Sequence, residues 1–98
     1  MIPTGTNLFV RIDEKSGHRR MPAETFQAHL DYLKAIAADR PFAGGGFIEA
    51  SGGMILFQAE NFEEAHKISR EDPVIKEGFF SYTLKQWEVL LASPSRMG

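Results

Sequence analysis

His29 is the residue best placed in this sequence to move a proton at neutral pH. It falls within a stretch, residues 22–39, whose apolar spacing predicts a helix. At about 100° per residue, His29 lies on the flank of the helix's apolar stripe and should point toward the sheet. That stripe consists of Phe26, Leu30, Leu33 and Ala37. An imidazole in a partly buried cleft is a standard general acid or base. The alternative is a packed histidine satisfied by a local hydrogen bond, and position alone favours it.

Asp72 is the second candidate, and it has a clear structural role available. It precedes Pro73, and an aspartate before a proline at the first helical position is a good N-cap. A functional role is compatible with capping, since one carboxylate oxygen can cap while the other orients a histidine and fixes its tautomer. The sequence alone leaves open whether His29 and Asp72 touch.

The remaining chemical motifs are poor candidates. Glu63 and His66 form one Glu-x-x-His, whereas di-iron helix bundles need two such motifs, so a solvated helix face is the favoured interpretation. His18, His29 and His66 have no spacing typical of a metal site, and the chain has no cysteine. We therefore expect no metal and no cofactor.

A run of three glycines, residues 44–46, invites comparison with a phosphate-binding loop. It lacks the Gly-Lys-Ser/Thr ending and does not lead into a helix. A kinked strand, or a close approach of the backbone to a ligand, explains the glycines better. No Gly-x-Ser-x-Gly motif of a serine nucleophile occurs.

Length and composition predict one globular domain, residues 1–98, with its core at about 7–90. The 98 residues are 43% apolar and 24% charged, with a net charge of −2. The one dense basic run is His18-Arg19-Arg20, so no nucleic-acid partner is expected. The longest uncharged apolar stretch, 52–57, is far too short to cross a membrane, and no signal peptide is evident. We expect a cytoplasmic protein without a membrane partner.

The hydropathy pattern predicts four strands and two helices in the order βαββαβ. The strands are expected at 7–12, 42–50, 54–59 and 79–89, the helices at 22–39 and 61–72, a short extra turn at 73–78 and a tail at 93–98. This is the α+β, ferredoxin-like arrangement, a four-stranded antiparallel sheet with both helices on one face. RNA-recognition modules share the order, but the strand that begins at Met54 lacks their basic, aromatic motif.

Two strands are apolar on both faces. Met54 to Phe57, and Phe79 with Phe80, break the alternation expected of a sheet covered on one side. Two helices can cover one face only, so we expect a homodimer that packs sheet against sheet. The alternative is that loops or the C-terminal segment cover the open face.

Three segments together resemble the YCII-related (YciI-like) family of dimeric α+β barrel proteins. They are Ala28-His29-Leu30 followed by Leu33; Phe42-Ala43-Gly44 leading to Gly52-Gly53 and Ile55; and Asn61-Phe62-Glu63-Glu64-Ala65, then Glu71-Asp72-Pro73-Val74 and Gly78-Phe79-Phe80. The resemblance implies a catalytic dyad of His29 and Asp72. One family member is a dehydrochlorinase of a chlorinated hydroxyquinol. The sequence departs from the family at Gly45, where proline is common.

The residues and the resemblance together favour a small-molecule enzyme that needs no cofactor. His29 would be the general acid or base and Asp72 would orient it, in a lyase or isomerase step such as proton abstraction with elimination. A non-catalytic ligand-binding or accessory domain with a structural His29–Asp72 pair is the main alternative. A cofactor-independent monooxygenase rests on fold analogy alone.

Overall fold

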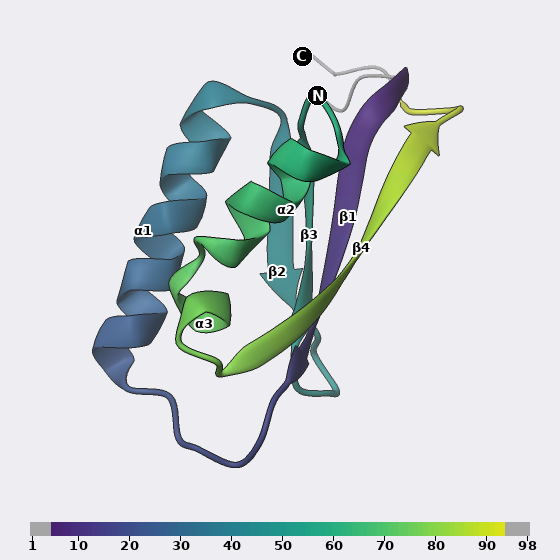
Figure 1. Ribbon diagram of the computed structural model, residues 1–98. Helices are drawn as coiled ribbons and strands as arrows, with labels where there is room; N and C mark the ends of the chain where they lie inside the picture. The colour runs from purple at the N-terminus through teal and green to yellow at the C-terminus, as the bar shows by residue number, and fades with distance from the viewer. Residues whose placement is uncertain (1–4, 94–98) are drawn as a thin grey trace.

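The computed structural model describes residues 5–93, which form one antiparallel sheet with all helices on the same face (Figure 1). The elements are β1 (Gly5–Lys15), α1 (Ala23–Asp39), β2 (Phe42–Gly46), β3 (Gly53–Gln58), α2 (Phe62–Arg70), α3 (Pro73–Lys76) and β4 (Phe80–Val89). The strand order is β2-β3-β1-β4. The predicted ferredoxin-like α+β fold is confirmed. The predicted tail, 93–98, lies outside the described residues except for Ser93.

The central strand, β1, organises both faces of the sheet. It pairs with β3 from Leu8 opposite Gln58 onward, and with β4 on its other side. Its odd-numbered residues from Phe9 to Asp13 face the helices, and the even-numbered residues from Leu8 to Ile12 face away. Successive side chains from Leu8 to Asp13 therefore alternate between the open face of the sheet and the face covered by the helices.

The helix starts follow the predicted capping chemistry, with small shifts. Pro22 was expected as the first helical residue, but its ψ of 149° is extended and it is the N-cap of α1 instead. Asn61 caps α2 as predicted, because its side-chain oxygen accepts from Glu64 N at 2.8 Å. Glu64 Oε1 in turn accepts a hydrogen bond from the backbone N–H of Glu60, one residue before the cap.

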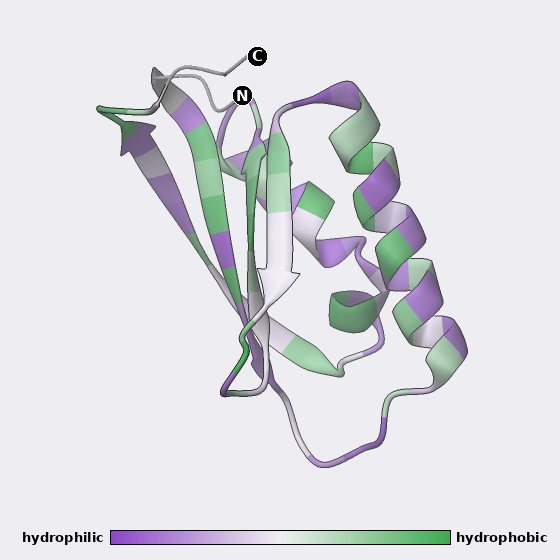
Figure 2. Cartoon of the chain, turned by 180° about the vertical axis from the view of Figure 1, so that it is seen from behind, coloured by the Kyte–Doolittle hydropathy of each residue, from purple (hydrophilic) through white to green (hydrophobic). Residues whose placement is uncertain are grey.

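The second strand is shorter than predicted, since β2 ends at Gly46 and residues 47–50 are not strand. Phe47 N donates to Gly52 O at 3.1 Å and closes the hairpin early. Gly52 has φ +89°, and a Cβ there would collide with the Asp13 carbonyl oxygen. The glycine end of β2 forms the pale arrow in Figure 2.

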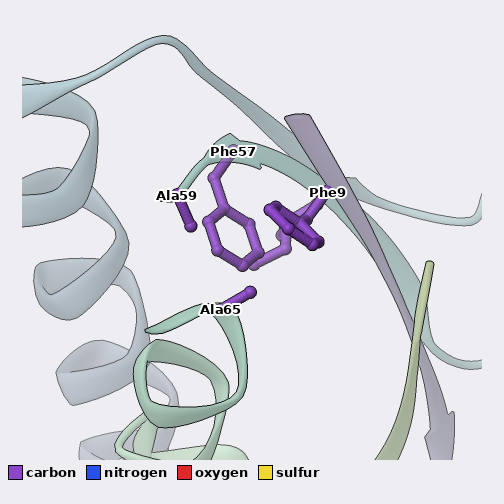
Figure 3. Packing of buried hydrophobic residues seen from close by; sticks show 5 residues of the cluster. Phe9, Phe57, Ala59 and Ala65 are labelled. Carbon is purple, nitrogen blue, oxygen red and sulfur yellow. The ribbon is translucent and has the colours of Figure 1, made fainter. Parts of the chain in front are cut away.

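Each face of the sheet has its own apolar cluster. Phe9, Phe57, Ala59 and Ala65 pack together on the covered face with Ile55 (Figure 3). The Phe9 ring also meets Phe62 edge to face at 5.0 Å. On the open face, Leu8, Leu56 and Val89 are buried, and Ala92 packs against them.

The expectation that Phe79 needs a second subunit is wrong. Phe79 precedes β4 and is already buried within the chain. The Arg19 guanidinium lies 4.2 Å from the centre of its ring, and Arg19 Nη2 donates to Glu77 O at 2.6 Å. The β1–α1 loop thus covers this phenylalanine.

Candidate functional site

The helices bring the two predicted site residues into direct contact. His29, in the second turn of α1, points at Asp72, the N-cap of α3. The distances from His29 Nδ1 to Asp72 Oδ1 and Oδ2 are 2.7 and 2.9 Å. Asp72 Oδ1 also accepts from Val74 N at 3.2 Å, so capping and histidine binding coexist in one carboxylate. Asp72 is fully buried and the His29 side chain is 14% exposed.

A buried arginine, not expected from the sequence, contacts Asp72 behind the pair. Arg11 lies on the covered face of β1 with no exposed surface. Its Nη2 donates to Asp72 Oδ2 at 2.9 Å and to Asp13 Oδ2 at 2.6 Å, while Nε donates to Asp13 Oδ1 at 2.7 Å. Its Nη1 is buried without a hydrogen-bond partner among residues 5–93. Arg11 therefore links Asp13, Asp72 and His29 into one polar cluster.

These contacts decide the charge state of Asp72. Burial alone would raise its pKa, but the hydrogen bond from His29 and the charge of Arg11 together hold the pKa below the ordinary value. Burial likewise opposes the charge of Arg11, and the two carboxylates outweigh it and raise the Arg11 pKa. At neutral pH Asp72 is thus a carboxylate that can only accept hydrogen bonds. His29 Nδ1 must be the donor, which leaves Nε2 of a neutral ring free to accept a proton.

A pocket of about 210 Å³ adjoins His29. Its wall is mainly apolar, and the polar side chains in it are His29 and Asp13. The apolar lining comes from Phe26, Leu30, Leu33, Met54, Ile55, Val74 and Phe80, and the backbone of five glycines completes the wall. For scale, an engineered cavity of about 150 Å³ binds benzene. The space therefore suits a single six-membered ring.

The glycine run of β2 lies along this pocket. A Cβ at Gly44 would lie 2.8 Å from Ile55 Cγ2, so this position has no room for a side chain. A Cβ at Gly45 would meet nothing within 4 Å. The departure from the family at Gly45 thus leaves open space beside the pocket.

The other predicted candidates do not join the site. His66 was expected on a solvated helix face, but it is half-buried and its Nδ1 lies 2.9 Å from Tyr82 Oη. Within residues 5–93, no group of three or more His, Cys, Asp or Glu side chains could hold a metal ion. None of the helices in that range is long and apolar enough to cross a membrane.

Comparison with known proteins identifies the family. Residues 8–88 match the YCII-related domain. The chain belongs to the YCII-related family. A relative, the uncharacterised protein YjpA of Bacillus subtilis (strain 168), is 30% identical over 67 residues, which are 67% of this chain and 79% of YjpA.

One enzyme of known structure has a fold similar to that of this chain. It is 5-chloro-2-hydroxyhydroquinone dehydrochlorinase (TftG) from Burkholderia phenoliruptrix AC1100, in complex with 2,5-dihydroxybenzoquinone. The TM-score is 0.63 at 25% sequence identity, and the match covers 83% of this chain and 93% of TftG. The YCII-related fold of this chain therefore also occurs in an enzyme that acts on a single substituted ring.

Proposed function

We propose that this YCII-related protein is a cofactor-independent small-molecule enzyme in which His29 is the general acid–base residue and Asp72 orients it. One observation carries the proposal: the His29–Asp72 hydrogen bond of 2.7 Å lies at the wall of a pocket. The pocket has space for one ring, and His29 in its wall is a group that exchanges protons.

The reaction type that fits this pair is proton abstraction followed by elimination or isomerisation. In an elimination, His29 Nε2 takes a proton from the substrate. The electron pair of the broken bond forms a new double bond, and the leaving group departs with its own electrons. Asp72 stabilises the resulting imidazolium through Nδ1, as a carboxylate does for other catalytic histidines.

The similarity to TftG supports an elimination in particular, because that enzyme is a dehydrochlorinase. The test is chloride release from 5-chloro-2-hydroxyhydroquinone by the wild type and by His29→Gln. Acid–base help of this kind is worth roughly 10²–10⁴-fold, so we expect His29→Gln to slow release by that factor. His66→Gln, a histidine change outside the pocket, is the matched control and should keep the rate. Equal rates in the wild type and His29→Gln would exclude His29 from the mechanism.

A non-catalytic ligand-binding role is the second candidate. It is favoured by the structural duties of Asp72, which caps α3 and neutralises part of the charge of Arg11. Under this alternative the pocket binds a ring but converts none of the compounds offered. His29→Gln would then change affinity and no rate.

We further propose that the protein is a homodimer joined through the open face of the sheet. Exposed apolar side chains support this proposal. Met54 and Trp87 are 45% and 46% exposed, and Leu90 and Leu91 follow β4 at 81% and 91%. Ala92 covers part of the open face, but these larger side chains remain exposed to solvent.

A further inference from the structure

The pocket wall has two polar side chains, and the proposed function uses one of them. The other is Asp13, near the end of β1 on the covered face of the sheet. Asp13 is only 7% exposed, yet it lines the same pocket as His29. A carboxylate kept away from solvent and beside an otherwise apolar space needs a reason.

Arg11 fixes the Asp13 carboxylate in one orientation. The guanidinium binds both carboxylate oxygens, at 2.7 and 2.6 Å, in a two-pronged pair. Each oxygen keeps lone-pair capacity for one more donor, since an ionised carboxylate offers about four acceptor sites. Asp13 is therefore a pre-oriented acceptor at the pocket wall.

The charged groups around the pocket indicate which net charge a ligand can carry. Neither Lys nor Arg contributes to the lining, so an anionic ligand would meet no cation in the wall. Arg11 also pairs with Asp72, so Arg11, Asp13 and Asp72 together carry one net negative charge. A cation would nevertheless lose its hydration beside a mainly apolar wall, which disfavours a charged ligand of either sign. A neutral ring that donates a hydrogen bond fits these conditions best.

We propose that Asp13 is a second ligand-binding residue, whose carboxylate accepts a hydrogen bond from a hydroxyl group on a neutral, single-ring ligand. Arg11 is its positioning residue. This inference rests on the proposed function, because it assigns the substrate class of the same pocket. It differs from a purely structural role, in which Asp13 does nothing more than neutralise Arg11.

The experiment compares three small probes by NMR titration: hydroquinone, para-difluorobenzene and benzoate. The first two rings are close in size, but only hydroquinone donates hydrogen bonds. We expect the wild type to bind hydroquinone about tenfold or more tightly than para-difluorobenzene, the worth of one hydrogen bond to a charged group. Benzoate should bind more weakly than hydroquinone. The shifted amide signals should include pocket residues such as Ile55.

Asp13→Asn should reduce the preference for hydroquinone to less than about threefold while para-difluorobenzene binds as before. An amide keeps one uncharged acceptor oxygen, which Arg11 would share, so it accepts a hydrogen bond from the ligand more weakly than a carboxylate does. Because this variant leaves Arg11 short of a partner, the double variant Arg11→Met with Asp13→Leu provides a second test. Replacing a buried ion pair by apolar groups is often tolerated. This variant also removes the hydrogen bond from Arg11 to Asp72, so its NMR spectrum must first show the wild-type fold; it should then lose the preference too. Asp31→Asn, at an exposed position on α1, is the control and should retain it.

Two results would overturn the inference. One of them leaves the proposed function intact, and the other excludes it as well. If the Asp13 variants keep the wild-type preference while binding maps to the pocket, Asp13 is structural and the proposed function stands. If no probe perturbs the pocket signals, the ligand assignment and the proposed function both fail.

Discussion

The covered face of the sheet buries charges beside its apolar core, whereas the open face buries apolar side chains alone. On the covered face, Arg11 and Asp13 follow Phe9 along β1 at every second residue. On the open face, Leu8 and Leu56 pack with Val89 and leave Trp87 half exposed. Charges taken out of water are costly unless their partners are fixed, so the covered face tolerates little movement. The open face lacks such constraints and suits association with a second surface.

The largest expected effect comes from Arg11→Met. Removing the guanidinium leaves Asp13 and Asp72 buried without their common partner, and breaking a buried pair costs about 3–5 kcal/mol. Urea denaturation should show a loss of that size in the free energy of unfolding. Arg20→Met, at an exposed loop position, should change it by less than about 0.5 kcal/mol. Comparable losses in the two variants would contradict the claim that the buried charges of the covered face depend on Arg11.

Asp72→Asn should cost about 2–3 kcal/mol at neutral pH, because hydrogen bonds to a charged group are replaced by weaker ones. Its pH dependence is the sharper signature. The Asp72 pKa lies below its ordinary value of 3.8, so the carboxylate stabilises the fold above that pH. This contribution is lost as the pH falls through the lower folded-state pKa. Stability curves measured from neutral pH downward should therefore fall less steeply for Asp72→Asn than for the wild type. Parallel curves would contradict the assignment.

On the open face, Trp87→Ser should act on association more than on folding. We expect the dimer dissociation constant to rise about tenfold or more, since buried aromatic side chains dominate interfaces. Stability measured at low concentration should change by less than about 1 kcal/mol, because Trp87 is 46% exposed in the single chain. Sedimentation velocity over a range of concentrations measures the first quantity. A wild-type chain that stays monomeric at high micromolar concentration would refute the dimer.

Tyr32→Phe should have the smallest effect, about 1 kcal/mol. Tyr32 Oη donates to Ile68 O at 2.7 Å, which ties α1 to α2 on the covered face. Burial is the main reason that the Tyr32 pKa is raised to about 12. The neutral phenol therefore stabilises the fold below pH 10.0, the ordinary value, and this contribution disappears as the pH rises through about 12. Absorbance titration of the wild type should show this late step, and Tyr32→Phe should lack it.

The sequence predicted the elements and two members of the site, because those depend on local patterns. Helical spacing put His29 on the inner flank of α1, and the Asp-Pro step marked Asp72 as a cap. Arg11 alternates with Phe9 along β1, so both lie on the same face of the strand. Nothing local shows that Arg11 is buried, because its burial depends on Asp72, which is 61 residues away in sequence. An arginine and an aspartate two residues apart, on the strand face that carries Phe9, were the available signal.

The strand boundaries were harder to predict for a similar reason. Residues 47–50 were predicted as strand, yet the hydrogen bond from Phe47 N to Gly52 O closes the hairpin at the end of β2. The position of Gly52 depends on the backbone of β1, because a Cβ there would collide with the Asp13 carbonyl oxygen. Phe79 was expected to be covered by a second subunit. The side chain that covers it is Arg19, from a loop 60 residues earlier in the chain. Long-range contacts of this kind leave no periodicity in the sequence.

The most direct test of the central claim is the tautomer of His29, measured by nitrogen-15 NMR on the imidazole ring. The carboxylate of Asp72 requires a proton on Nδ1, which leaves Nε2 of this pocket-lining histidine as the proton acceptor. For the neutral ring, we predict a protonated Nδ1 and an unprotonated Nε2 in the wild type, and a loss of this preference in Asp72→Asn. A neutral ring that carries its proton on Nε2 in the wild type would exclude the proposed role of Asp72 in orienting His29.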